Sequence, residues 1–428
     1  MNPLAGTPGP VPLKTACLAI CWVLLGSLAA ARQDLPRSAN FFQLTPDSVS
    51  GGTSSQRVGN PIAYALERAG PGSVLQLSPG AYPPFSIGLR SKSAGNARAS
   101  GQPGRPITIE GQGGVVITSG QGGADTILIA QQVPTAHIVF RNLTIQTGYR
   151  AGVMFARGGV HVGFRFHDCN IEGGFNHLSG RGRKSKWGIW GSQLQDFEFK
   201  GVFQPAVVRN IRDEHGFYLQ NSQGDITIEN VRGEFLGRTF CQFTSRSSEG
   251  SVGVGTITIK NCKVRDIGLA PGDAHKGGAA FTFGGGHNGT IRIEKCEYLC
   301  GFDRNLKRLT NKGSPYGTGA LVMITHGAGP TRRLILKDNR FQFNKDSGDR
   351  PVVSIGGCRD LQILGGNRFV AGAYEVALEL DPVQENGSLR SPANGKVQIA
   401  MAAEITGRVE VRGKPATEAE LARLRGGP

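Results

Sequence analysis

The sequence predicts an all-β fold, a parallel β-helix in which short strands wind into coils that stack along one axis. Glycine accounts for 64 of the 428 residues and aromatic residues for only 7%, a composition that favours many short strands joined by tight turns. Two apolar-alternating segments also recur in a fixed order along most of the chain, with a period of about 30 residues, which is the signature of a solenoid.

The repeat is clearest in the later segment of each pair. Eight copies read HIVFRNLTI, FRFHDCNI, FEFKGVF, DITIENVRG, TITIKNCKV, TIRIEKCEY, RLILKDNRF and LQILGGNRF. The earlier segments read TILIA, GVMFA, WGIW, GFYL, FCQF, AFTF, ALVMI and VVSI. Aligning the later segments places one residue of each in a single inward column: Leu143, Cys169, Val202, Val231, Cys262, Cys296, Asn339 and Asn367. Strands this short bury a face only by stacking on the next coil.

The residue before each member of that column marks a tight corner. These positions are Asn142, Asp168, Gly201, Asn230, Asn261, Lys295, Asp338 and Gly366. Asn, Asp and Gly tolerate the left-handed backbone that such a corner needs. The six cysteines after the first 31 residues form no C-x-x-C pair and three of them fall in the inward column, so we expect buried free thiols and no zinc site.

Short helices are expected at the two ends of the solenoid. Asn60 can cap a helix that begins at Pro61 and ends at Gly70, and this helix would cover the first coil. The segment PATEAELARLRGGP predicts a second short helix from about Pro415. We therefore expect one β-helix domain over residues 51–410 and a tail with a short helix over residues 411–428.

The first 31 residues resemble a secretory leader. Lys14 precedes an apolar run over residues 16–28, which three alanines follow. The run is shorter than the roughly 20 residues that a membrane-spanning helix needs. We predict a cleaved signal peptide over residues 1–31, a linker over residues 32–50, no transmembrane segment, and a secreted or periplasmic location.

The charge balance favours an anionic partner. The formal net charge is +16 at pH 7, with 48 Lys and Arg against 32 Asp and Glu. A basic exported protein suits an acidic polysaccharide or an anionic cell surface, whereas a merely solvated basic surface is the alternative. Export and the lack of a recognised binding module count against nucleic acid.

The segments GSVLQLSPGAYPPFSI and GQPGRPITIEGQGGVVITSG, followed by the repeated coils, resemble a known family. They are similar to the exported right-handed parallel β-helix proteins of the pectate-lyase-like superfamily, and most to the opening of its chondroitinase-B and alginate-lyase branch. The resemblance covers residues 51–410 and implies a right-handed helix. That superfamily contains lyases, epimerases, hydrolases and proteins without known catalysis, so the activity stays open.

The resemblance implies removal of the C5 proton of a uronic acid residue, by a lyase or a C5-epimerase. Such a site needs a cation that neutralises the carboxylate, a base near C5 and an acid for the leaving oxygen. Basic side chains precede the first strand of consecutive coils, at Arg150, Lys186, His215, Arg238 and Lys276, and Lys184 lies in the loop before the strand WGIW. Stacked coils would align them as a basic stripe.

The stretch RDEHGFY is the strongest single candidate site. We assign His215 as the base, Arg238 or Arg212 as the group that neutralises the carboxylate, and Tyr218 as the acid. Glu214 joins Arg150, Lys184, Lys186 and Lys276 as a substrate-binding candidate. If Phe217 points inward, strict alternation also turns His215 inward, so a histidine hydrogen-bonded at the start of a strand is the alternative.

Motifs of the related enzymes match only in part. DEHG resembles the Asp-Pro-His-Asp motif of the mannuronan C5-epimerases, but Glu214 replaces the Pro and Gly216 replaces the final Asp. GRGRKSKW offers Lys184 without the expected upstream Glu, so neither the catalytic lysine of the chondroitinase-B branch nor its Ca²⁺ is supported, and we expect no cofactor or metal. No Asp-Asp pair occurs, which disfavours a polygalacturonase-type hydrolase.

These observations together predict a monomeric, exported β-helix protein that acts on a uronate-containing polysaccharide, as a lyase or a C5-epimerase. The alternative is a non-catalytic carbohydrate-binding or cell-surface protein built on the same scaffold.

Overall fold

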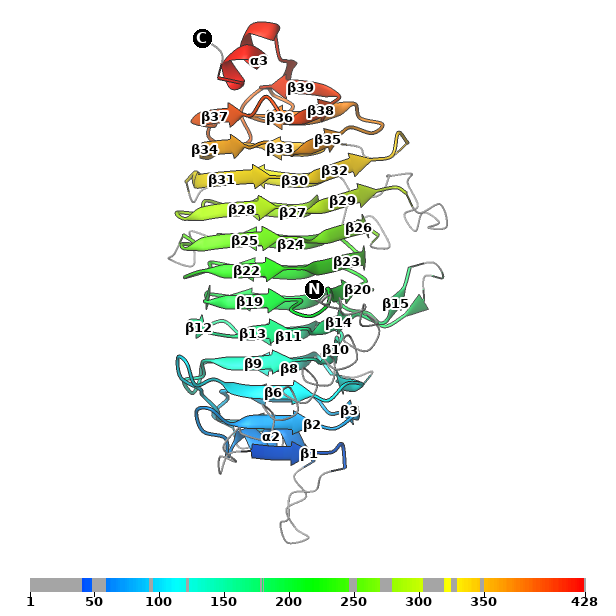
Figure 1. The fold of residues 1–428 in the computed structure, drawn as a ribbon, viewed down its shortest axis with the longest axis vertical. Coiled ribbons are helices and arrows are strands. Elements are labelled where there is room, and N and C mark those ends of the chain that lie inside the picture. The colour runs from blue at the N-terminus through cyan, green and yellow to red at the C-terminus, as the bar shows by residue number, and fades with distance from the viewer. Residues whose placement is uncertain are drawn as a thin grey trace, which may run out of the picture. The chain divides into compact units, whose positions relative to one another are not determined.

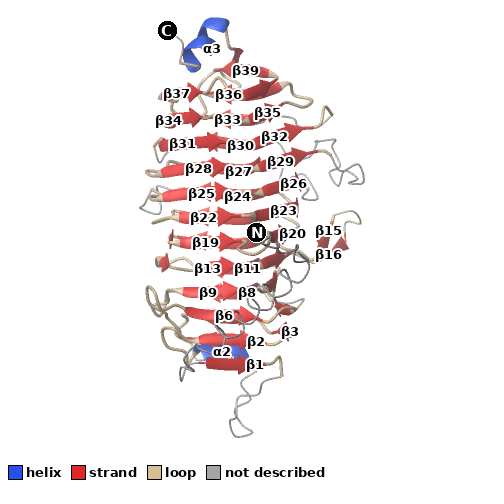
Figure 2. Ribbon diagram, viewed as in Figure 1, coloured by secondary structure: helices blue, strands red, loops and turns tan. Residues whose placement is uncertain are grey.

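The computed structural model describes residues 41–47, 59–91, 95–120, 123–177, 179, 181–245, 252–269, 279–302, 319–324, 329–346 and 350–426. Within these residues the chain forms three long sheets that run side by side along a stack of coils (Figures 1 and 2). Each coil contributes one strand to each sheet in the order A, B, C. The predicted right-handed parallel β-helix is therefore confirmed.

Sheet A has 12 strands in the described part of the chain. They are β1 (Phe41–Leu44), β2 (Val74–Leu77), β6 (Ile107–Gly111), β9 (Ile138–Arg141), β13 (Arg165–His167), β19 (Phe197–Lys200), β22 (Ile226–Glu229), β25 (Thr256–Lys260), β28 (Thr290–Glu294), β31 (Thr331–Lys337), β34 (Cys358–Ile363) and β37 (Lys396–Ile399).

Sheet B has 11 described strands and follows the predicted corners. They are β3 (Gly80–Tyr82), β7 (Val115–Thr118), β10 (Thr144–Gln146), β14 (Asn170–Glu172), β20 (Ala206–Arg209), β23 (Val231–Leu236), β26 (Lys263–Ile267), β29 (Glu297–Cys300), β32 (Arg340–Phe343), β35 (Arg368–Val370) and β38 (Glu404–Thr406).

Sheet C has 13 described strands. They are β4 (Phe85–Ile87), β5 (Asn96–Ala97), β8 (Asp125–Ile129), β11 (Ala151–Phe155), β17 (Trp187–Ser192), β21 (His215–Gln220), β24 (Thr239–Thr244), β27 (Ala279–Gly284), β30 (Gly319–Ile324), β33 (Val353–Ile355), β36 (Val376–Leu380), β39 (Arg408–Val411) and β40 (Lys414–Pro415). Two short pairs lie outside the three sheets: β12 (His161–Val162) with β18 (Leu194–Gln195), and β15 (Phe175–Asn176) with β16 (Arg181–Gly182).

Each coil therefore contains three strands, whereas the sequence pattern suggested two. A segment such as HIVFRNLTI holds a sheet A strand, the corner and a sheet B strand. Seven of the eight predicted corner residues adopt positive φ, for example 53° at Asn142 and 55° at Asn230, and Gly201 is the exception. The Asn230 side chain donates to the Gly201 carbonyl of the coil before it, at 2.9 Å, so the corner residue both turns the chain and ties two coils together.

The residues predicted for the inward column are buried, with one exception. Val202 is 48% exposed instead of buried, because residues 201–205 bulge out of the coil. The Asp168 carboxylate accepts the backbone N–H groups of Val202 and Phe203 at 2.6 and 3.0 Å and fixes this bulge. Ala206, which is 1% exposed, pairs with Val231 and takes the inward place.

The cysteines lie where the pattern predicted. The six described cysteines are buried free thiols, and burial raises the pKa of Cys169 to about 12. Cys262 Sγ lies 3.7 Å from the Ile228 carbonyl oxygen, in the geometry of a thiol hydrogen bond. These thiols therefore behave as small core residues.

Both helices are present with small differences. Helix α2 (Pro61–Leu66) is capped by Asn60, whose side chain accepts the Ala63 N–H at 3.0 Å. Helix α3 (Glu418–Leu424) begins three residues after Pro415, because Thr417 and Glu420 form a capping box and Pro415 belongs to β40. Neither described helix has the length and apolarity to cross a membrane. The predicted leader over residues 1–31 lies outside the described residues.

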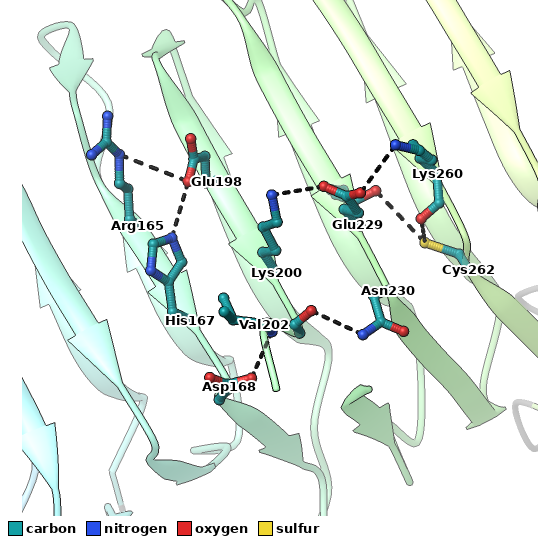
Figure 3. Close-up of polar contacts among 12 residues, drawn as sticks. Arg165, His167, Asp168, Glu198, Lys200, Val202, Glu229, Asn230, Lys260 and Cys262 are labelled. Atoms are coloured by element: carbon teal, nitrogen blue, oxygen red, sulfur yellow. Dashed lines mark hydrogen bonds and ion pairs between the residues drawn. The ribbon is translucent and has the colours of Figure 1, made fainter. Parts of the chain in front are cut away.

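The outer face of sheet A is a ladder of charges that largely neutralise one another (Figure 3). Its main register column reads Glu110, Arg141, His167, Lys200, Glu229, Lys260, Glu294 and Lys337. Lys200 and Lys260 approach the two carboxylate oxygens of Glu229 at 2.8 and 3.3 Å. His167 interrupts the alternation, and its Nε2 lies 3.0 Å from Glu198 Oε2 in the next column.

The exchange of Val202 for Ala206 in the inward column can be tested with a pair of substitutions. Ala206→Asp buries a carboxylate in the core and should lower the free energy of unfolding by more than about 3 kcal/mol. Val202→Asp, four residues earlier in the exposed bulge, should change it by less than about 0.5 kcal/mol. Denaturant titrations followed by circular dichroism measure both. Equal losses would show that the register is wrong at this coil.

The ladder predicts a specific loss of stability in acid. The hydrogen bond with His167 lowers the pKa of Glu198, against the opposing effect of burial. This stabilisation is present above the unfolded value of about 4.3 and disappears as the pH falls through the lower folded value. Unfolding free energy measured against pH should fall less steeply below about pH 4.3 in Glu198→Gln than in the unmodified protein. Parallel curves would contradict the role given to this pair.

Candidate functional site

A local break in the strand alternation creates an outward-facing site on sheet C. Phe217 is fully buried, and a Cβ at the preceding Gly216 would lie 3.2 Å from Val208 Cγ1 and 3.4 Å from Leu236 Cδ1, both inside the core. Two successive positions therefore face inward, so His215 and Tyr218 share the outer face. Their ring centroids are 5.1 Å apart.

Strand β17 repeats the same break one coil earlier. Gly188 faces the core side chains of Ile171 and Val208, and Ile189 is fully buried. Trp187 and Trp190 consequently lie on the outer face in the same register as His215 and Tyr218. Strict alternation along the strand predicts that His215 points inward, whereas in the structure it lies on the outer face. The glycine explains the difference because, without a side chain, it occupies an inward position that would otherwise be crowded.

Trp187, Trp190 and Tyr218 form what we term the aromatic platform. The Trp187 and Tyr218 rings are nearly parallel, at 6.2 Å and 29°, and the two tryptophans lie 6.2 Å apart. Met154 and Leu128 continue the platform over two earlier coils, in register with Trp190. These side chains form a cluster that is separate from the main core. Within this cluster Trp190 is only 8% exposed, whereas Trp187 and Tyr218 are half-buried.

Beside the platform, the predicted basic stripe contains an acid. The backbone bonds from Trp187 N to Arg150 O, from His215 N to Lys186 O and from Arg238 N to Glu214 O show which residues stack at this place. The stripe therefore reads Arg150, Lys186, Glu214 and Arg238, with Glu214 at the position expected for His215. Lys184 is exposed in the segment that leads to β17, and Lys276 lies outside the described residues.

Glu214 connects two of the residues assigned to the reaction. Its Oε2 lies 3.1 Å from His215 Nε2 and 3.3 Å from Arg238 Nη1. His215 is only 2% exposed, whereas the Arg238 side chain is 36% exposed. A carboxylate at one ring nitrogen orients an imidazole and strengthens it as a base. The position of Glu214 therefore suits a residue that orients His215, and it suits the predicted direct contact with substrate less well.

Arg212 and Arg150 are engaged elsewhere. Arg212 Nε lies 3.5 Å from Asp213 Oδ1, and its guanidinium carbon lies 5.4 Å from the Phe175 ring centroid in β15. Arg150 forms a two-point ion pair with Asp125 of the preceding coil. Arg238 and Arg212 were the two arginines predicted to neutralise a substrate carboxylate. Of these two, Arg238 is the one that contacts Glu214, the partner of His215.

Sequence reasoning missed four residues of this face: Trp187, Trp190, Arg157 and Gln220. Gln220 Nε2 donates to the Tyr218 hydroxyl oxygen at 2.8 Å, and Arg157 Nη2 donates to Gln220 Oε1 at 3.4 Å. The Arg157 guanidinium also lies 5.6 Å from the Trp190 ring centroid. One signal was present: two of the three tryptophans of the chain occur together in WGIW.

Three other described histidines, His161, His177 and His287, are buried, whereas His275 and His326 lie outside the described residues. Burial lowers the pKa of His161 and His287, and it lowers the pKa of His177 to about 4. His287 Nε2 lies 3.0 Å from the Gly255 carbonyl oxygen. No group of three His, Cys, Asp or Glu side chains within the described residues is placed to hold a metal ion.

Two hollows lie away from the platform. One, of about 360 Å³, is lined by Phe175, His177, Asn210 and Phe235 at the hairpin of β15 and β16. The other, of about 880 Å³, lies between β37, β39 and α3. Neither contains the residues assigned from the sequence.

No family model matches the sequence, and no curated protein matches it. Several solved structures are similar. An alginate lyase from Paenibacillus sp. str. FPU-7 has 15% identity and a TM-score of 0.49, over 75% of this chain and 94% of that chain. The pectate lyase Pel9A has 12% identity and a TM-score of 0.44, over 74% and 78%. A rhamnogalacturonan lyase has 14% identity and a TM-score of 0.44, over 91% and 99%. Each is a likeness of fold.

Proposed function

We propose that the outer face of sheet C binds an acidic, uronate-containing polysaccharide and removes its C5 proton, as a lyase or a C5-epimerase. The observation that carries the proposal is the aromatic platform beside Lys186 and Arg238. Aromatic rings offer flat apolar surfaces to the C–H faces of sugars, and the cations attract carboxylates. Successive coils repeat at about 4.8 Å, close to the length of one sugar residue. Export through the leader belongs to this proposal.

His215 and Tyr218 of β21, with Glu214 just before β21 and Arg238 just before β24, would supply the groups that the reaction needs. Arg238 would pair with the uronate carboxylate and make the C5 proton more acidic. His215, oriented by Glu214, would take that proton as the C5–H electrons form the C4–C5 double bond and the C4–O bond breaks. Tyr218 would protonate the departing glycosidic oxygen. In an epimerase, C5 would instead be reprotonated on its opposite face, with no bond to oxygen broken.

One observation favours the non-catalytic alternative. Only 2% of His215 is exposed to solvent, whereas a catalytic base must reach the proton that it removes. A carbohydrate-binding protein needs only the platform and the cations, and Trp187, Tyr218, Lys186 and Arg238 are all at least partly exposed. The two proposals share the same binding face and differ only in whether the β21 groups meet the sugar ring.

The catalytic version predicts an unsaturated product. Incubation with alginate, pectate and glycosaminoglycans should raise the ultraviolet absorbance of the unsaturated uronate on at least one polymer, and His215→Ala should reduce this rate by about 100-fold or more. For an epimerase, exchange of the C5 proton with deuterated water replaces the absorbance signal. Binding without either reaction would leave the non-catalytic alternative; reaction unchanged in His215→Ala would remove His215 as the base.

The binding face predicts a matched pair of affinity changes. Trp187→Ala removes a half-buried ring of the platform and should weaken binding of a uronate oligosaccharide by about tenfold, or about 1.4 kcal/mol. Phe203→Ala removes a ring that is 90% exposed in the bulge between sheets A and B, and it should leave affinity unchanged. Isothermal titration calorimetry measures both. Equal affinities in the two variants would place the ligand elsewhere.

A further inference from the structure

We infer that the pocket at the hairpin of β15 and β16 (Figure 2) binds a neutral pyranose sugar, as a second site separate from the aromatic platform. Its volume is about 360 Å³, and the described residues that line it are Gly174, Phe175, Asn176, His177, Asn210 and Phe235. Small-molecule sites begin at about 300 Å³. The inference goes beyond the proposed function and does not depend on it, because none of these residues takes part in the proposed reaction.

The buried histidine of the pocket lacks the partners that such a group normally has. His177 is 2% exposed, and neither of its ring nitrogens has a hydrogen-bond partner within the described residues. The carbonyl groups of Phe235, Ile211 and Leu269 near the ring act against the lowering of its pKa by burial, but none is in hydrogen-bonding geometry. The pKa is still lowered to about 4, so the ring is neutral at pH 7. Because most buried polar side chains are hydrogen-bonded, both nitrogens suit a ligand that carries a donor and an acceptor.

The opposite wall carries an aromatic residue with a strained backbone. Phe235 has a φ of 54°, and the residues stacked on it in the preceding and following coils are Asn210 and Asp266, with φ of 58° and 51°. Asn and Asp tolerate this left-handed conformation, whereas a phenylalanine there is an outlier. Strain of this kind is concentrated at functional sites. Here it accompanies a ring on the pocket wall, 6.5 Å from the His177 ring.

The rest of the pocket is built from ordered contacts between coils. Phe175, which is 3% exposed, meets the His177 ring edge-on, at 4.6 Å and 83°. Glu172 holds the rim, since its Oε1 accepts the Gly174 N–H at 3.0 Å and the Asn210 Nδ2–H at 2.8 Å. The pocket is therefore formed by the fold itself, as is usual for sites that bind small molecules.

The chemistry of the lining favours a neutral sugar. A neutral imidazole offers one N–H donor and one acceptor nitrogen, and sugar hydroxyls can match both. Phenylalanine rings offer flat apolar surfaces to the C–H face of a pyranose. None of the described lining residues is Asp, Glu, Lys or Arg, so an anionic ligand would find no counter-charge in the lining. A purely apolar ligand would leave both His177 nitrogens unpaired at a buried position.

One cation lies close to the pocket without lining it. The Arg212 guanidinium carbon is 5.4 Å from the Phe175 ring centroid, and Arg212 Nε is 3.5 Å from the Asp213 carboxylate. Its charge is therefore balanced in part by a neighbour in the sequence. This arrangement again favours a neutral ligand over an anion.

Binding of simple glycosides tests the site. Saturation-transfer NMR with the methyl pyranosides of glucose, galactose and mannose should show saturable binding of at least one, with a Kd on the order of 1 mM for so small a ligand. His177→Phe keeps a flat ring and removes both nitrogens, so the affinity should fall by about tenfold or more. His167→Phe is the matched control, because it makes the same change on sheet A, and it should leave the affinity unchanged.

The melting temperature separates a ligand site from a structural role. Since His177 is buried without hydrogen-bond partners, His177→Phe should melt no lower than the unmodified protein, as expected where a residue serves binding at the expense of stability. A lower melting temperature would assign the imidazole to the fold and overturn the inference. So would the absence of saturable binding by all three glycosides, or equal affinities in His177→Phe and the unmodified protein. The reaction proposed at His215 is measured on uronate polymers and stands or falls separately.

Discussion

Parallel hydrogen bonding between successive coils is the constraint on which the rest of the structure depends. It places residues about 30 positions apart in the sequence at neighbouring points of one sheet, so Trp187 of one coil lies against His215 of the next. The corners hold this register, because Asn142 and Asn230 turn the chain and bond to the coil before. Any slip of one residue would exchange the inner and outer faces.

The fold was predictable because its signals are local and repeated. Corner residues at Asn142 and Asn230 and the buried Cys262 follow directly from backbone preference and apolar alternation. The bulge at Val202 was not predictable, since it depends on Asp168 of the preceding coil accepting two backbone N–H groups. Such a contact between coils leaves no mark in the local pattern.

The candidate site was only half predictable for the same reason. RDEHGFY identified a real cluster in which Glu214 contacts His215 and Arg238. Alternation gave His215 the wrong face, because the inward placement of Gly216 depends on the core side chains that surround it. Gln220 lies two residues from Tyr218, yet it also contacts Arg157, which lies 63 residues earlier in the sequence. Roles set by contacts across coils need coordinates.

The contrast between two faces of the solenoid explains why function is assigned to sheet C. On sheet A the charges alternate along the axis, as with Glu229 between Lys200 and Lys260, and they satisfy one another. On sheet C, by contrast, Lys186 lies near the Trp187 ring and Arg157 lies near the Trp190 ring. Apart from Trp22, which falls in the predicted leader, Trp187 and Trp190 are the tryptophans of the chain, so a fluorescence titration with a uronate oligosaccharide tests this assignment most directly. We predict a saturable change in tryptophan emission; saturable binding by calorimetry with unchanged emission would contradict the assignment.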